Sequence, residues 1–299
     1  MAYRSLLAVP ATSRKMVEKA LGSEADGVFL DLEDAVAPSE KAGAREDVIR
    51  ALREAEWRGR PPRLRVNALD TPYFYRDLVE VVEEVGSLLG AVLIPKVDLP
   101  EDLHVVDTLL SQLEAACEVE PGRIRVEAQI ESAKGLQNVD AIARAGGGRL
   151  TALHFGPGDY AASLGMPGSS IGAEDEWDRE YPGHRFHYAM HRIAVAARSA
   201  GLYAFDGPLA DYRDEEGLRR AALNARSIGM HGKWCIHPAQ IQAVNEAFSP
   251  TAGELAWARE VVEAYEEAGE SGLGSISVEG KMVDAASIRM ARGILDSSG

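Results

Sequence analysis

Residues 27–34, GVFLDLED, contain a short apolar run that passes directly into a cluster of carboxylates. A run of this length, rich in β-branched and aromatic residues, predicts a strand that is buried on both faces of a sheet. Similar runs recur along the chain, and most end on a charged or hydrogen-bonding residue. These terminal residues are Asn67, Lys96, Glu131, Asp159, Asp206 and His237. If the strands are parallel, these side chains meet at one rim and can form a site there.

The alternation of strands and helices predicts the fold class. We expect strands at 4–9, 26–31, 63–67, 91–96, 125–131, 150–155, 202–206 and 231–236, with helical patterns between them. Eight strand–helix units in about 235 residues are typical of a (β/α)8 TIM barrel. A doubly wound open sheet is the alternative, because alternation alone does not close a barrel. The long segment 163–184 is expected to be a loop over the rim.

The pattern changes after residue 250. A helix is expected at 251–268, followed by a flexible joint at Gly269, Gly272 and Gly274 and by a small hairpin at 275–283. A last helix follows Asp284. We therefore expect a barrel domain in residues 1–249 and a C-terminal helical and hairpin extension in residues 250–299. Such an extension can act as a lid or as an arm shared between subunits.

The composition limits the classes of partner. The 299 residues carry a net charge of −15, which argues against a nucleic-acid partner. No apolar run approaches the roughly 20 residues that span a bilayer, so no membrane association is expected. Two cysteines do not make a disulfide framework, and no signal-peptide pattern is present. Cytoplasmic localisation is the expectation.

Two carboxylates on neighbouring strands form a candidate metal site. Glu131 and Asp159 end the fifth and sixth strands, and hard oxygen ligands of this kind suit Mg2+. The alternative is structural: Asp159 caps the following helix and Glu131 makes an ion pair. Zinc at His184, His187 and His191 is disfavoured, because three ligands on one helix do not converge easily on one ion.

Arg65 is a candidate for binding an anion. An arginine in an otherwise apolar strand is costly to bury unless it meets a negative charge, and its fork of donors suits a carboxylate or an oxyanion. A buried ion pair with Glu33 or Asp34 is the alternative. These two carboxylates are also candidates to accept from metal-bound water or to orient Arg65.

The remaining candidates have weaker signals. A structural hydrogen bond at the rim is the favoured interpretation of Lys96, Asp206 and His237. Asp284 precedes Ala285-Ala286-Ser287, which is typical of a helix N-cap. If the extension folds over the rim, Asp284 is instead a candidate general base.

The first twenty residues are basic in an otherwise acidic chain. This segment contains one acidic residue, Glu18, against four basic residues: Arg4, Arg14, Lys15 and Lys19. The basic patch is compatible either with an anionic ligand or with a solvated helix face.

Several motifs in order give the chain a resemblance to a known family. They are Leu30–Pro38 (LDLEDAVAP), Arg65-Val66-Asn67, Asp70–Asp77 (DTPYFYRD), Ile94–Val97 (IPKV), Ile130-Glu131-Ser132, Gly158–Ser163 (GDYAAS), Asp206-Gly207-Pro208, Gly232–Pro238 (GKWCIHP) and Gly280–Asp284 (GKMVD). Together they resemble the citrate lyase beta-subunit-like (HpcH/HpaI aldolase) superfamily, and most closely its malyl-CoA lyase group.

The resemblance implies a TIM barrel, a C-terminal lid that reaches a neighbouring subunit, and a homo-oligomer such as a trimer or hexamer. It implies Mg2+ or Mn2+ at Glu131 and Asp159. It places the family arginine, beside a bound 2-oxo acid, at Arg65 and the acid/base aspartate at Asp284. It assigns coenzyme A contacts to Arg14 and Lys19.

The implied reaction is the reversible Claisen cleavage of L-malyl-CoA, and of β-methylmalyl-CoA, to glyoxylate and acetyl-CoA or propionyl-CoA. The preference between glyoxylate and pyruvate depends on the loop 166–184 and on the surroundings of Asn67. The alternatives are a citramalyl-CoA lyase, a malyl-CoA thioesterase and a non-catalytic CoA-ester-binding protein.

Overall fold

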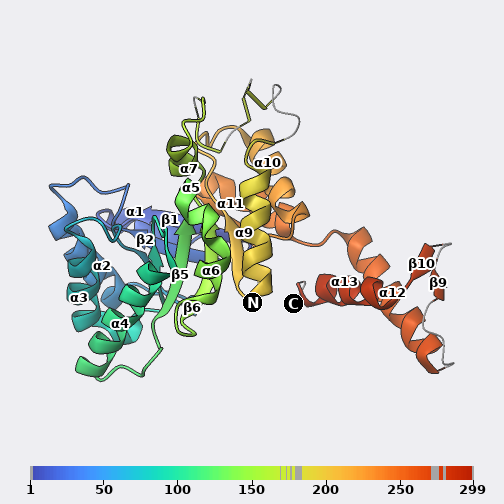
Figure 1. The fold of residues 1–299 in the computed structure, drawn as a ribbon, viewed down its shortest axis with the longest axis horizontal. Coiled ribbons are helices and arrows are strands. Elements are labelled where there is room, and N and C mark those ends of the chain that lie inside the picture. Colours follow the sequence, from blue (N-terminus) through green and yellow to red (C-terminus); the bar gives the residue numbers. More distant parts are fainter. Residues whose placement is uncertain are drawn as a thin grey trace. The chain divides into compact units, whose positions relative to one another are not determined.

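A closed barrel forms the larger part of the chain (Figure 1). The computed structural model describes residues 3–168, 170–172, 174–175, 177–178, 184–270, 276–278 and 281–297. In this part of the chain, eight parallel strands pair in sequence order, and β8 pairs with β1 to close the ring. Helices surround the ring. The predicted (β/α)8 barrel is confirmed, and the open sheet is excluded because β1 and β8 are not edges.

The barrel strands are short. They are β1 (Ser5–Pro10), β2 (Gly27–Asp31), β3 (Arg63–Arg65), β4 (Ala91–Ile94), β5 (Arg125–Ile130), β6 (Leu150–Phe155), β7 (Tyr203–Asp206) and β8 (Gly232–Cys235). Strand β3 ends two residues earlier than predicted, because the backbone N–H of Asn67 donates to the carboxylate of Asp77 at 2.9 Å instead of joining the ladder.

The helices follow the strands, as predicted. They are α1 (Arg14–Leu21), α2 (Lys41–Glu54), α3 (Phe74–Val85), α4 (Pro100–Ala116), α5 (Ala133–Gln137), α6 (Val139–Arg144), α7 (Pro157–Ser163), α9 (His187–Ser199), α10 (Glu215–Ser227) and α11 (Ile241–Phe248), with 3-10 turns η1 (Gly86–Leu88) and η2 (Pro238–Gln240). The connection after β5 contains two short helices, and α7 begins directly after Gly156. Residues 169, 173, 176 and 179–183 of the predicted loop 163–184 lie outside the described residues.

The barrel interior is filled by side chains from alternate positions of the strands. Leu6, Phe29, Leu93, Phe205 and Trp234 form one cluster with Ala152, and each is at most 3% exposed. Side chains alternate between the two faces of a strand, so the apolar runs supply this interior cluster and also the layer beneath the helices. This packed core fixes the directions in which the strand ends project at the rim.

The C-terminal segment forms a second compact unit, which begins at Glu246. It contains α12 (Ala252–Glu270), the antiparallel strands β9 (Ile276–Val278) and β10 (Lys281–Val283), and α13 (Ala285–Asp296). Val261, Val283, Ile288 and Ala291 form its core with Ala258. Helix α12 continues through Gly269, so the predicted joint does not start there. Gly272, Gly274 and the 279–280 turn lie outside the described residues.

No helix in the described part of the chain has the length and apolar character needed to cross a membrane.

Candidate active site

A cavity of about 570 Å3 opens at the carboxyl ends of the strands. Its polar side is formed by Arg65, Glu131, Asp159 and Asp34, together with Asp31. These residues come from the ends of β2, β3, β5 and β6, as the strand-end pattern predicts. Apolar residues form the other side, among them Ile171, Pro208, Ala210 and Ile236. The cavity thus joins a charged wall to an apolar wall.

Arg65 is held in place by three carboxylates. Its Nε and Nη2 donate to the two oxygens of Asp31 at 2.8 and 2.6 Å, a bidentate pair that fixes the plane of the guanidinium. Its Nη1 lies 2.9 Å from Glu33 and 3.5 Å from Asp34. Burial works against the charge, but Asp31 and Glu33 outweigh it and raise the pKa of Arg65. Arg65 is therefore a fixed cation at the cavity wall.

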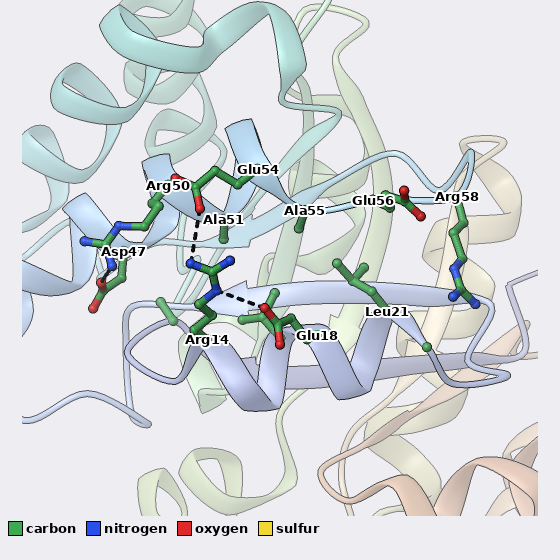
Figure 2. Close-up of a pocket in the computed structure, with 13 residues that line it drawn as sticks. Arg14, Glu18, Leu21, Asp47, Arg50, Ala51, Glu54, Ala55, Glu56 and Arg58 are labelled. Atoms are coloured by element: carbon green, nitrogen blue, oxygen red, sulfur yellow. Dashed lines mark hydrogen bonds and ion pairs between the residues drawn. The ribbon is translucent and has the colours of Figure 1, made fainter.

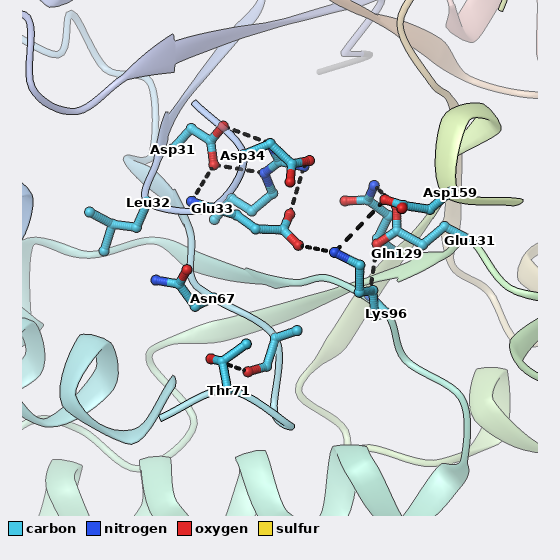
Figure 3. A network of polar contacts seen from close by, with 12 residues as sticks. Asp31, Leu32, Glu33, Asp34, Asn67, Thr71, Lys96, Gln129, Glu131 and Asp159 are labelled. Atoms are coloured by element: carbon cyan, nitrogen blue, oxygen red, sulfur yellow. Dashed lines mark hydrogen bonds and ion pairs between the residues drawn. The ribbon is translucent and has the colours of Figure 1, made fainter. Parts of the chain in front are cut away.

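Lys96 connects the carboxylates around Arg65 to the pair Glu131 and Asp159 (Figure 3). Its Nζ donates to Glu33 at 2.7 Å and lies 3.8 Å from Asp159, and its backbone N–H donates to Glu131 at 2.8 Å. The φ angle of Lys96 is +53°, a left-handed conformation that is uncommon for a residue with a side chain. This turn at the end of β4 directs the ammonium and the N–H to different carboxylates. Burial disfavours the ammonium, but the bond to Glu33 raises the pKa of Lys96 overall.

Glu131 is buried among other negative charges. Its Oε1 accepts from Lys96 N–H, and its Oε2 accepts from Gln129 Nε2 at 2.5 Å. Burial, together with the charges of Glu33 and Asp159, raises the pKa of Glu131 to about 8. Glu33 is also buried, and desolvation raises its pKa despite the neighbouring Arg65 and Lys96. The site therefore carries more carboxylate than its two cations can balance.

The surroundings of Glu131 fit a hard divalent cation. The oxygen Oε1 of Gln129 is buried and has no hydrogen-bond partner in the described part of the chain. Gly156 leaves the carboxylate room, because a Cβ at this position would lie 2.3 Å from Glu131 Oε2. No three His, Cys, Asp or Glu side chains among the described residues are arranged to hold a metal by themselves. Mg2+ commonly takes one or two carboxylates and completes its shell with water and substrate oxygens.

Three predicted rim residues have structural partners. Asn67 donates from Nδ2 to Asp77 at 2.5 Å. Asp206 accepts from the buried Lys233, also at 2.5 Å. The Nδ1 of His237 accepts from the backbone N–H of Ala239 at 3.1 Å. These contacts match the structural interpretation that was favoured for Asp206 and His237.

Asn67, by contrast, was expected near the substrate, and the structure buries it with Asp77.

Arg14 lies on the surface in a cavity of about 250 Å3 between α1 and α2 (Figure 2). Its Nε donates to Glu18 at 2.9 Å, and its Nη1 lies 3.3 Å from Glu54. Lys19 is exposed on the same helix, five residues on, and five steps of 100° point it about 140° away from Arg14. The structure therefore does not bring the two predicted coenzyme A contacts together, and Arg14 is already paired with carboxylates.

Asp284 caps α13 in the C-terminal unit. Its Oδ1 accepts from the backbone N–H groups of Ala286 at 2.9 Å and Ser287 at 3.0 Å. These bonds lower the pKa of Asp284 and keep it ionised. The N-cap interpretation thus describes its observed contacts, and the acid/base role stays a prediction.

Sequence reasoning missed four residues of the site. Asp31 is the main partner of Arg65, whereas Glu33 and Asp34 were expected. Gln129 and Gly156 shape the surroundings of Glu131, and Trp234 lines the cavity. Asp31 and Arg65 end adjacent strands and pair in register, so the pairing of β2 with β3 was a usable signal. Cys235 is buried, and burial raises the pKa of its thiol to about 12.

Comparisons with known proteins define the family. A model of the HpcH/HpaI aldolase/citrate lyase family matches residues 4–238. The L-malyl-CoA/beta-methylmalyl-CoA lyase of Rhodobacter capsulatus is 40% identical over 294 residues, which are 96% of this chain and 91% of that protein. The citrate lyase subunit beta of Escherichia coli (strain K12) is 37% identical over 292 residues, with 98% and 92% covered.

A solved structure gives the same result at the level of the fold. Protein CitE from Mycobacterium tuberculosis, in complex with magnesium, acetoacetate and coenzyme A, superposes with a TM-score of 0.79. It is 29% identical, and the match covers 100% of this chain and 98% of that chain. The chain belongs to the HpcH/HpaI aldolase/citrate lyase family. The prediction that it is a lyase of this kind is confirmed.

Proposed function

We propose that this chain is a Mg2+-dependent acyl-CoA lyase that cleaves L-malyl-CoA to glyoxylate and acetyl-CoA, and β-methylmalyl-CoA to glyoxylate and propionyl-CoA. The observation that carries this proposal is the cavity that joins Glu131 and Asp159 to the fixed cation Arg65. The relatives named as malyl-CoA lyases cover nearly the whole chain and favour this substrate. The magnesium and coenzyme A in the CitE structure support the cofactor and the thioester.

The charged wall suits the polar end of such a substrate. Mg2+, or Mn2+, held by Glu131 and Asp159 would act as a Lewis acid on the hydroxyl and carboxylate oxygens. Arg65 offers preorganised donors to the oxygen on which negative charge develops. Its bidentate pair with Asp31 keeps these donors from reorienting during the reaction.

The bond changes are those of a retro-Claisen cleavage. The hydroxyl group loses its proton to solvent, the bond between its carbon and the α-carbon of the thioester breaks, and glyoxylate leaves. The bonding electrons remain on the acyl-CoA as an enolate, which then takes a proton to give acetyl-CoA. In the reverse direction the carboxylate of Asp284 removes that α-proton. We place Asp284 over the rim of a neighbouring subunit in a homo-oligomer, as the family resemblance implies.

Product analysis tests the proposal. Purified protein with Mg2+ is given malyl-CoA and, separately, citramalyl-CoA, and the products are separated by liquid chromatography. We expect glyoxylate and acetyl-CoA from malyl-CoA, at a kcat/KM above that for citramalyl-CoA. Pyruvate from citramalyl-CoA as the dominant reaction would replace the substrate assignment, and free CoA with malate would indicate a thioesterase. No turnover of either ester would contradict the lyase proposal.

A further inference from the structure

A chain of buried polar groups crosses the barrel interior beneath the cavity. Arg63 donates from Nε to Glu127 Oε1 at 2.9 Å, and Glu127 Oε2 lies 3.0 Å from His154 Nε2. His154 Nδ1 accepts from the indole N–H of Trp234 at 2.8 Å. These residues come from β3, β5, β6 and β8, and each is at most 6% exposed. Of these four hydrogen-bonded residues, Trp234 is the one that lines the cavity.

The partners fix the protonation of the histidine. An indole nitrogen only donates, so Nδ1 of His154 must be an unprotonated acceptor. The ring then carries its single proton on Nε2 and donates it to Glu127. A doubly protonated imidazole would set two donors against each other at Trp234. His154 is therefore a neutral imidazole in one tautomer.

Glu127 lies inside this series of hydrogen bonds, between Arg63 and His154. Burial alone would raise the pKa of Glu127, but the Arg63 guanidinium and the hydrogen bond from His154 outweigh burial and lower it. The two oxygens accept from two different donors. A carboxylate satisfies both, whereas an amide offers only one oxygen and turns an NH2 group toward the other donor.

Trp234 connects the buried hydrogen bonds to the wall of the cavity. The centre of the Arg65 guanidinium lies 5.5 Å from the centroid of its ring, within the range of a cation–π contact. Phe29 packs against the indole with ring centroids 4.7 Å apart. The indole of Trp234 is therefore held by the hydrogen bond from its N–H and by packing against Phe29, and the guanidinium of Arg65 lies over its face. Three carboxylates hold Arg65 by its nitrogens, and the indole supplies a further wall.

We propose that Trp234 is a positioning residue for Arg65, and that the buried chain of Arg63, Glu127 and His154 sets the orientation of its indole. This rests on the proposed function for the role of Arg65 in turnover, but the positioning itself does not. Trp234 acts here through Arg65: the carboxylates hold the guanidinium at its nitrogens, and the indole restrains its face. A loss of the indole's anchor therefore lets the guanidinium tilt about its pair with Asp31 without removing any ligand of the metal.

The test uses two variants, one at Trp234 and one at Glu127 inside the hydrogen-bonded series, and one matched control. Trp234→Phe keeps an aromatic ring but removes the N–H. Glu127→Gln leaves Trp234 intact and changes a residue away from the cavity. Phe205→Leu is the control, because Phe205 stacks on the face of His154 at 5.0 Å and has no hydrogen-bonding group. It perturbs the same core and leaves every hydrogen bond of the chain in place.

The positioning is measured without any substrate. Nitrogen-15 NMR follows the Nε–H signal of Arg65, identified by its loss in Arg65→Lys, and its exchange with water. We expect Trp234→Phe and Glu127→Gln to shift this signal and speed its exchange, and Phe205→Leu to leave it unchanged. An unchanged signal in both variants would overturn the proposal, whatever the enzyme does. If Glu127→Gln does not fold, Trp234→Phe alone decides.

Turnover supplies the second readout. With malyl-CoA and Mg2+, we expect kcat to fall about 10- to 100-fold in Trp234→Phe and in Glu127→Gln, the scale of a misplaced catalytic group. KM for the thioester should stay within about twofold, because coenzyme A contacts are untouched. Equal losses in all three variants, in step with their melting temperatures, would mean a merely structural role. An inactive wild type would contradict the proposed function and leave the NMR result to judge the positioning.

Discussion

At the scale of single residues, the site is defined by an excess of negative charge. Glu131 is almost fully buried, and burial with Glu33 and Asp159 raises its pKa to about 8. A carboxyl in such a place is protonated near neutral pH unless a cation joins it. A divalent ion between Glu131 and Asp159 would relieve the repulsion and displace that proton.

This predicts a pH-dependent affinity for Mg2+. Between the ordinary value of 4.5 and about 8, the folded metal-free protein holds a proton that the unfolded chain has lost. Its stability therefore falls as pH rises through this window. Binding of Mg2+ releases the proton, so the apparent affinity rises with pH and levels off above about 8. Calorimetry at pH 7 in two buffers of different ionisation enthalpy measures the release. Glu131→Gln should remove both effects, and metal binding without proton release would contradict this.

Asp284 has two roles that a single substitution can separate. Asparagine caps a helix about as well as aspartate, so Asp284→Asn should keep α13 and the melting temperature. It removes the carboxylate, and we expect turnover to fall by about two to four orders of magnitude if Asp284 is the general base. Ser287→Ala is the control, because it keeps the carboxylate of Asp284 and removes two contacts of the cap, the 3.2 Å contact to Oδ1 and the bond that Ser287 Oγ accepts from the N–H of Asp284 at 3.4 Å. Wild-type turnover in Asp284→Asn would leave the residue as a cap alone.

At the scale of elements, the turns that follow the strands determine where the side chains of the site lie. The turn from β6 to α7 brings Gly156 against Glu131, and the turn after β4 places Lys96 in a left-handed conformation. Neither feature is visible in a sequence pattern, because each depends on how closely two backbones approach. The strand ends themselves were predictable, since apolar runs mark where parallel strands stop.

Gly156→Ala tests the close approach in this turn. The new Cβ would lie 2.3 Å from Glu131 Oε2 and 2.8 Å from Gln129 Nε2, so the carboxylate must move. We expect Mg2+ affinity to fall at least about tenfold while circular dichroism shows an intact barrel, because a ligand has lost its geometry. Gly158→Ala in the same turn is the matched control, since its Cβ meets only the Ile171 side chain, at 3.3 Å. Equal affinity in the two variants would argue against Glu131 as a ligand.

The hydrogen-bond partners of Arg65 and Asn67 differ from those that the sequence indicated. The sequence indicated that Arg65 needs a negative partner, and it pointed to Glu33 and Asp34. The structure gives the bidentate place to Asp31, because β2 and β3 pair with Asp31 opposite Arg65. Asn67 was expected near substrate, but the carboxylate of Asp77 on α3 takes both its N–H and its amide. The contact between Asp31 and Arg65 follows from the pairing of two adjacent strands, whereas the contact between Asp77 and Asn67 depends on how α3 packs, which a single sequence does not reveal.

At the scale of the whole molecule, the rim is uneven. The ends of β2 to β6 supply the charged wall, whereas Asp206 and His237 at the ends of the last two strands are occupied by structural bonds. Residues after β6, such as Pro208 and Ile236, instead supply the apolar wall. A substrate with an anionic end and an acyl chain matches this division. If Asp284 is the general base, as we propose, a complete site also needs the C-terminal unit of a neighbouring subunit.

If neighbouring subunits complete each other's sites, two inactive variants should complement. Arg65→Lys damages the barrel site and Asp284→Asn damages the extension. Mixed and allowed to exchange subunits, they form some sites with both intact residues, and we expect up to about a quarter of wild-type activity from random pairing in a simple shared-site oligomer. Either variant mixed with itself is the control. No recovery, with subunit exchange shown by mass spectrometry, would place both residues in the same subunit's site.

With a metal at Glu131 and Asp159, the rim is expected to make and break a carbon–carbon bond. The most direct measurement follows carbon-13 acetyl-CoA and glyoxylate with the protein by carbon-13 NMR. With Mg2+ we predict the appearance of labelled malyl-CoA, and with EDTA, Glu131→Gln or Asp159→Asn we predict none above the uncatalysed rate. Formation of malyl-CoA at the wild-type rate in the EDTA sample or in the two variants would contradict a metal-dependent lyase at this rim, as would its absence with Mg2+.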